Sequence, residues 1–94
     1  MAVTAHATSQ PGTVVSTLIT DTVIVAARVG RRILIITNDH ATQVVYARLA
    51  ATGAVANAGI RINPAGGVFA IEGYDGPVCG ISVGGTSAVL VVEV

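Results

Sequence analysis

The sequence contains no lysine and no tryptophan, only one cysteine, and few aromatic or charged residues. A lone cysteine, Cys79, excludes an intrachain disulfide and is typical of proteins made in a reducing compartment. The formal net charge of zero leaves no basic footprint for nucleic acid, so we expect no nucleic-acid partner. The cations are all arginines, whose planar guanidinium suits specific ion pairs at interfaces.

Apolar residues, in contrast, make up 52% of the chain, against 11% charged residues. An ordinary soluble domain has about 25% charged residues. A membrane span needs about 20 uninterrupted apolar residues, whereas the best run, residues 23–36, is cut by Arg28, Arg31 and Arg32. Residues 1–11 have neither a basic start nor an apolar block, so we expect no signal peptide. We therefore expect no membrane partner and assign the excess apolar surface to an interface.

The segment Arg31–Asn38 is central to the predicted fold. It contains four consecutive large aliphatic residues and ends at the turn-forming pair Asn38-Asp39. A strand that is apolar on both faces must be covered on both faces. The final segment, Ser87–Val94, has the same character. Because the chain is short, we expect another subunit to supply part of this cover.

Valine, isoleucine and threonine dominate the sequence and favour strands, and no window has a helical apolar period. The pattern predicts an all-β fold, a small β-sandwich or barrel of roughly seven to nine short antiparallel strands. Residues 13–38 are expected to form a three-stranded meander with a tight turn at Gly30, and Gly84-Gly85 a two-residue hairpin loop. Residues 1–12 are expected to form an extended N-terminal arm and residues 13–94 a single β domain. The predicted strands are 13–20, 22–29, 31–38, 43–51, 60–63, 68–72, 78–83 and 87–94.

The arm alternates Val3, Ala5 and Ala7 with small polar residues, and it is detached from the next strand by Pro11. Such a segment becomes ordered when it lies on the sheet edge of a neighbour. The predicted interface combines two arm residues, side chains opposite the presumed core, and arginines. A wider core with both faces buried in one chain is the alternative. The interface candidates are Val3, Ala5, Ile24, Arg28, Arg31, Arg32, Val44, Tyr46 and Arg48.

Several finer features follow from the same alternation. Phe69 and Ile71 are expected to face inward, and Cys79 to be a small core residue on the same face as Ile81. Arg31 and Arg32 are expected at the rim of the subunit packing, paired with Glu72 or Glu93 in the oligomer.

No motif predicts catalysis. The serines lie outside any nucleophile-elbow sequence, and His6 and His40 have no close cysteine or histidine with metal-ligand spacing. The glycine-rich stretch 53–67 lacks the Gly-Lys-Ser/Thr ending of a phosphate loop. We therefore expect no enzyme and no catalytic, metal-binding or cofactor-binding residues. Tyr46 and Tyr74 are the candidates for a shallow glycan site, although a tyrosine in a turn more often packs under its own loop.

The second half of the chain resembles small virion β-proteins of tailed bacteriophages, especially capsid cement (decoration) proteins. The resemblance covers residues 30–94 and depends on Val45–Leu49, Gly59–Gly67, Gly73–Val78 and Gly85–Val94. It implies a homotrimer on the outer surface of the capsid that clamps neighbouring major capsid proteins, made first in the host cytoplasm. It also implies that the N-terminal segment contacts the capsid. The alternatives are a tail- or fibre-associated β-module and a small glycan-binding lectin-like domain.

Overall fold

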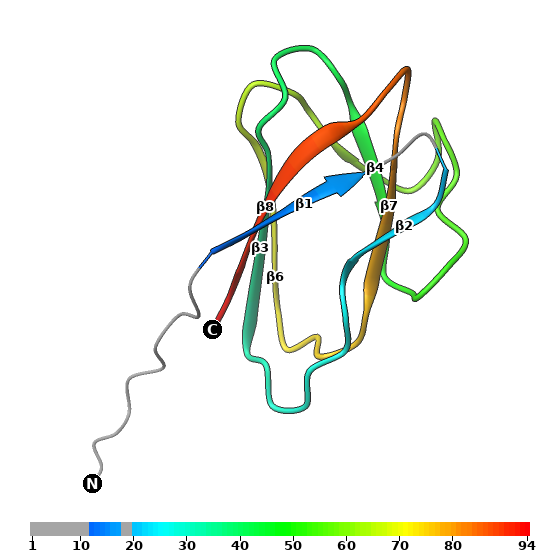
Figure 1. The fold of residues 1–94 in the computed structure, drawn as a ribbon. Helices are drawn as coiled ribbons and strands as arrows, with labels where there is room; N and C mark the ends of the chain where they lie inside the picture. The colour runs from blue at the N-terminus through cyan, green and yellow to red at the C-terminus, as the bar shows by residue number, and fades with distance from the viewer. Residues whose placement is uncertain (1–11, 18–19) are drawn as a thin grey trace, which may run out of the picture.

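The structure is a computed structural model that describes residues 12–17 and 20–94. Within these residues the chain forms eight strands and no helix. The strands form two four-stranded antiparallel sheets that make up the two layers of a sandwich (Figure 1). Their bounds are β1 Thr13–Thr17, β2 Thr22–Val25, β3 Ile33–Asn38, β4 Val45–Arg48, β5 Ile60–Ile62, β6 Gly67–Glu72, β7 Val78–Ser82 and β8 Ser87–Glu93.

The strand order is β1-β8-β3-β6 in one sheet, called sheet A here, and β2-β7-β4-β5 in the other, sheet B. Only β4 and β5 are neighbours both in sequence and in a sheet; every other connection crosses from one sheet to the other. This winding is the topology of an eight-stranded jelly roll, one of the architectures that protect sheet edges by wrapping two sheets together. The prediction of an all-β sandwich is confirmed.

The predicted meander over residues 13–38 is wrong, because β1 pairs with β8 and β2 pairs with β7. The Gly84-Gly85 hairpin is also wrong, since β7 lies in sheet B and β8 in sheet A. Turn residues mark where the chain reverses direction. They do not indicate which sheet it enters next, and that choice depends on pairing between distant strands.

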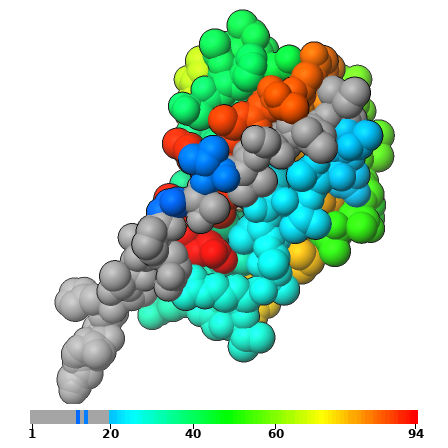
Figure 2. Space-filling view, in the orientation of Figure 1, coloured from blue at the N-terminus to red at the C-terminus, as the bar shows by residue number. Residues whose placement is uncertain are grey.

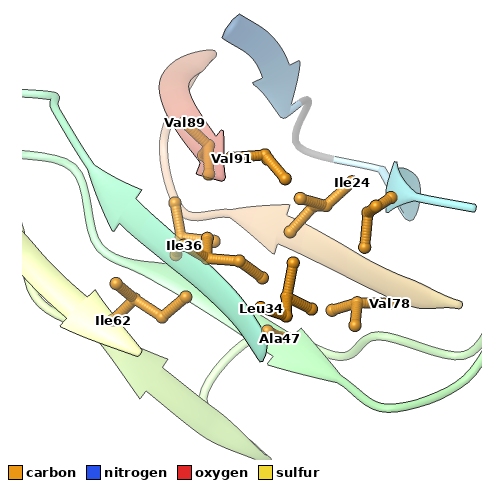
Figure 3. Packing of buried hydrophobic residues seen from close by; sticks show 10 residues of the cluster. Ile24, Leu34, Ile36, Ala47, Ile62, Val78, Val89 and Val91 are labelled. Carbon is orange, nitrogen blue, oxygen red and sulfur yellow. The ribbon is translucent and has the colours of Figure 1, made fainter. Parts of the chain in front are cut away.

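Aliphatic side chains fill the space between the two sheets (Figure 3). Leu34 and Ile36 of β3 are completely buried there, opposite side chains from sheet B. Phe69 and Ile71 pack against this cluster from β6, as predicted. The buried cluster consists of Ile24, Val25, Leu34, Ile36, Val45, Ala47, Ile62, Val78, Val89 and Val91.

Strand β2 departs from the predicted alternation. Its register with β7 shifts between Val23 and Val25, which is the mark of a β-bulge. Because the bulge inserts an extra residue, Ile24 and Val25 both enter the core while Val23 is half exposed. Ile24 was expected at the subunit interface, but it is a core residue with 4% of its surface exposed.

Candidate interaction surface

The outer face of sheet A is apolar, and no other strand of the described residues covers it. On β3 and β8 the buried side chains alternate with partly exposed ones, so the second set of aliphatics points away from the core. The edge strands add two strongly exposed valines, Val14 (64% exposed) and Val68 (60%). We call this surface the sheet A face; its members are Val14, Ile33, Ile35, Thr37, Val68, Ala70, Ala88, Leu90 and Val92.

The strand register joins these side chains into continuous rows. Leu90 pairs with Val14 on one side and with Thr37 on the other, and Thr37 pairs in turn with Val68. This row spans all four strands without a charged residue. In Figure 2, the part of β1 that is drawn in blue lies beside β8 (red) on the visible face.

A second row runs from Val92 through Ile35 to Ala70. The charged side chains of Arg32 and Glu72 are exposed at one end of the sheet, next to Ile33. Monomeric proteins rarely expose a contiguous apolar face of this kind, and a polar rim around such a face is typical of an interface. The sheet A face is therefore the surface best suited to bind another protein.

The small area of sheet A limits how strongly the sheet A face can bind a partner without further contacts. Four strands about 4.8 Å apart and about six residues long give a face of roughly 400 Å². A stable protein–protein interface buries about 800 Å² on each partner. The face therefore supplies about half of a standard interface, and a stable oligomer needs a second contact.

Sheet B, in contrast, is covered on its outer side by the chain's own loop, residues 49–59. The Tyr46 hydroxyl lies 3.4 Å from the side-chain oxygen of Asn57 and accepts a hydrogen bond of 3.1 Å from Arg61. The Arg61 guanidinium also lies over the Tyr46 ring, 5.9 Å from its centroid. Tyr46 points away from the core as predicted, but it is buried, so its ring is not open to a partner or a sugar.

Asp21 holds the same loop in place. Its carboxylate accepts hydrogen bonds from the backbone N–H groups of Gly53 (2.6 Å) and Ala54 (3.3 Å). The hydrogen bond from Gly53 is the main reason why the pKa of Asp21 lies below its ordinary value. The loop is therefore held by a charged group that remains ionised at neutral pH.

Cys79 lies next to Asp21 and is completely buried. The prediction that Cys79 is buried is correct. Cys79 shares a face with Ile81 as predicted, but that face is not the core face. The neighbouring Val78 enters the core, and Cys79 points to the opposite side of sheet B, near the backbone oxygen of Arg48 (3.8 Å). Burial raises the pKa of the Cys79 thiol, and the Asp21 carboxylate raises it further. The thiol is thus protonated and sheltered at neutral pH.

Replacing Asp21 with alanine should increase the alkylation rate of Cys79 several-fold, because the loop loses two hydrogen bonds that hold it over the thiol. The same opening is expected in the wild type at low pH. The folded-state pKa of Asp21 is depressed, so its contribution is present above the unfolded value near 3.8 and is lost as the pH falls through the folded value. Alkylation kinetics measure the first effect, and amide exchange of residues 53 and 54 measures the second. Asp39→Ala, an exposed change on another loop, is the control, and equal alkylation rates in the two variants would contradict the role of Asp21.

An open pocket of about 300 Å³ lies at the side of this loop. Arg48 is its one charged lining residue, and it donates a hydrogen bond to the backbone oxygen of Gly53 (3.3 Å). The other lining residues are Gly53, Val55, Ala58 and Gly59. Among the described residues, the lining includes no carboxylate, histidine, serine, threonine or cysteine.

Tyr74, the second glycan candidate, packs against the core and donates a hydrogen bond to the backbone oxygen of Pro77 (2.6 Å). It lies under its own turn, as a tyrosine in such a position was expected to do. Neither candidate tyrosine therefore presents a free ring for stacking against a sugar.

The remaining predicted interface residues fall into different environments. Arg31 pairs with Glu93, one of its two predicted partners, at 3.0 Å. Its expected place at the oligomer rim is wrong, because Arg31 is buried and the pair lies within one chain. Arg28 and Val44 are half-buried, whereas Arg32 and Arg48 are exposed. Val3 and Ala5 lie outside the described residues. The structure thus does not gather the described members of the predicted set into one patch. The apolar outer surface is formed instead by the partly exposed residues of β3 and β8 and their neighbours on the sheet A face.

The described residues include no group of three His, Cys, Asp or Glu side chains that could hold a metal ion. Nor do they form a helix capable of spanning a membrane. In comparisons with known proteins, no protein-family model matches the chain, and neither a curated protein nor a solved structure is significantly similar to it.

Proposed function

We propose that the protein is a structural virion component of a tailed bacteriophage. In this proposal it assembles as a homotrimer, binds the outer surface of the capsid and cements neighbouring major capsid proteins. The observation that carries the proposal is the sheet A face, an apolar surface spanning four strands with charged residues only at its end. The resemblance of residues 30–94 to capsid cement proteins supplies the class of partner.

The rest of the molecule fits a mechanical role. The two sheets are packed through a continuous aliphatic core, and the sheet B side is closed by a loop tied to Asp21 and Tyr46. Zero net charge does not oppose close packing of identical subunits. Many copies bound side by side on a lattice can hold a shell tightly even when each contact is weak.

Glycan binding is less well supported, because both candidate tyrosines are packed within the subunit. A tail- or fibre-associated module remains the second candidate, since the sheet A face would serve assembly on a tail equally well. The two structural roles differ in the location of the protein on the particle.

Cryo-microscopy of reconstituted particles tests this proposal. Capsids of the phage that encodes the chain are assembled without it, incubated with the purified protein and imaged beside untreated capsids. Added density on the outer shell at the local three-fold positions is expected, together with greater resistance of the particles to heating. Density confined to the tail would support the second candidate, and no added density at saturating protein would overturn both.

A further inference from the structure

Edge strand β6 of sheet A is not covered or paired on its outer side by any strand of the described residues. A strand edge exposes unpaired backbone groups, and natural proteins protect such edges with short strands, bulges, proline or charge. In sheet B, edge strand β5 has only three residues and edge strand β2 is bulged. In sheet A, edge strand β6 pairs with β3 over six residues without a shift. It contains no proline and no lysine, and its one charge, Glu72, lies at its end.

The free side of β6 has unused hydrogen-bonding capacity. In an antiparallel strand, alternate residues direct their N–H and C=O groups toward the partner and away from it. Those directed away from β3 have no hydrogen-bond partner among residues 12–17 and 20–94. On the same strand Val68 and Ala70 are exposed, so the edge is apolar as well as unpaired.

We propose that residues 3–8 of a neighbouring copy of the chain pair with this edge as a fifth strand of sheet A. The segment has six residues, the length of β6, and alternates valine and alanine with threonine and histidine. It contains no Asp, Glu, Lys or Arg, so pairing buries no such charge. Pro11 ends the segment before β1 begins.

The positions of the strands favour exchange between copies. β1 and β6 lie at opposite edges of sheet A, three strand intervals apart. In a head-to-tail arrangement the arm that precedes β1 in one copy lies beside β6 of the next copy. Such an arrangement forms a ring, for example a trimer, when the rotation between copies closes, and an open filament when it does not. The added strand also extends the sheet A face and supplies part of the contact area that the face lacks. This inference rests on the self-association in the proposed function, not on capsid binding.

Disulfide trapping between two single-cysteine chains tests the pairing. Ala5→Cys and Ala70→Cys are made separately in a Cys79→Ala background, with C-terminal tags of different length, and the two chains are co-expressed and oxidised. A disulfide-linked product of mixed size is expected at several times the yield obtained with the matched control pair Ala5→Cys and Ala51→Cys. Ala51 is exposed on the loop that follows β4. Equal yields for the two pairs would overturn the proposal.

A chain with both Ala5→Cys and Ala70→Cys distinguishes two arrangements of the arm. The arm either pairs with β6 of a neighbouring copy, which we call exchange, or pairs with β6 of its own subunit. A linked monomer, with no mixed product from the separate chains, would show that the arm folds back on its own sheet and would overturn the exchange. Removal of residues 2–10 should leave a folded subunit with faster amide exchange along β6 and a lower oligomer mass. Unchanged exchange at β6 would overturn the pairing even if the protein still binds capsids, so this failure is distinct from failure of the proposed function.

Discussion

Replacing Leu34 with aspartate is expected to unfold the protein, whereas the same replacement at Ile35 should leave a folded subunit that associates at least tenfold more weakly. The two residues are adjacent on β3 but face opposite sides of sheet A. Leu34 is completely buried among core aliphatics, and Ile35 belongs to the sheet A face. This pair of variants therefore separates folding from assembly.

The expected magnitudes follow from the two environments. An unpaired carboxylate in the core costs several kcal/mol or more, which is comparable to the entire stability of a small domain, about 5–15 kcal/mol. At Ile35 the carboxylate remains in water in the free subunit, so the cost to folding is about 1 kcal/mol of strand propensity. In the oligomer it is placed against an apolar partner surface, and association is weakened.

Circular dichroism and light scattering at micromolar concentration measure the two effects. Ile35→Val, which keeps an apolar β-branched side chain, should retain the wild-type mass and serves as the control. An Ile35→Asp chain that is folded and keeps the wild-type mass would show that the sheet A face is not a subunit contact. A monomeric wild type would remove the self-association on which the proposed function depends.

Replacing Arg31 with methionine is expected to lower the free energy of unfolding by about 3–5 kcal/mol, the usual cost of breaking a buried ion pair by removing one partner. The guanidinium donates to Glu93 (3.0 Å) and to the backbone oxygens of Ala26 (3.2 Å), Tyr74 (3.3 Å) and Gly76. It therefore ties two loops to the C-terminal strand. Methionine fills part of the volume but leaves a carboxylate and three carbonyl groups without this donor.

Urea unfolding measures the loss, and Arg32→Met is the matched control. Arg32 is the next residue and also an arginine, but it is exposed, and surface substitutions usually change stability by less than about 0.5 kcal/mol. Combining Arg31→Met with Glu93→Leu should cost less than the sum of the two single changes, because the second change removes the stranded carboxylate. Equal losses for Arg31→Met and Arg32→Met would show that the buried network contributes nothing to stability.

The contrast between Leu34 and Ile35 also shows how far local patterns reach. The period-two pattern placed most strands within a few residues of their observed bounds, and it correctly turned Phe69 and Ile71 inward. It also identified β3 and β8 as strands apolar on both faces. These features are local, because the alternation of side chains along a strand depends only on the backbone of that strand.

In contrast, which residues contact one another within the subunit depended on the packing of segments that are distant in the sequence. Pairing of β3 with β8 brings together residues more than 50 positions apart, and it merges two doubly apolar strands into one bare face. Cys79 is buried by a loop rather than by the core, and Arg31 meets Glu93 of its own chain. The alternation of apolar residues along one strand does not predict these long-range contacts. Each contact depends on which sheet a strand enters and which face a loop covers. The residues alone therefore predicted that apolar surface would be left over for a partner, and the packing of the two sheets determined where the apolar outer surface lies.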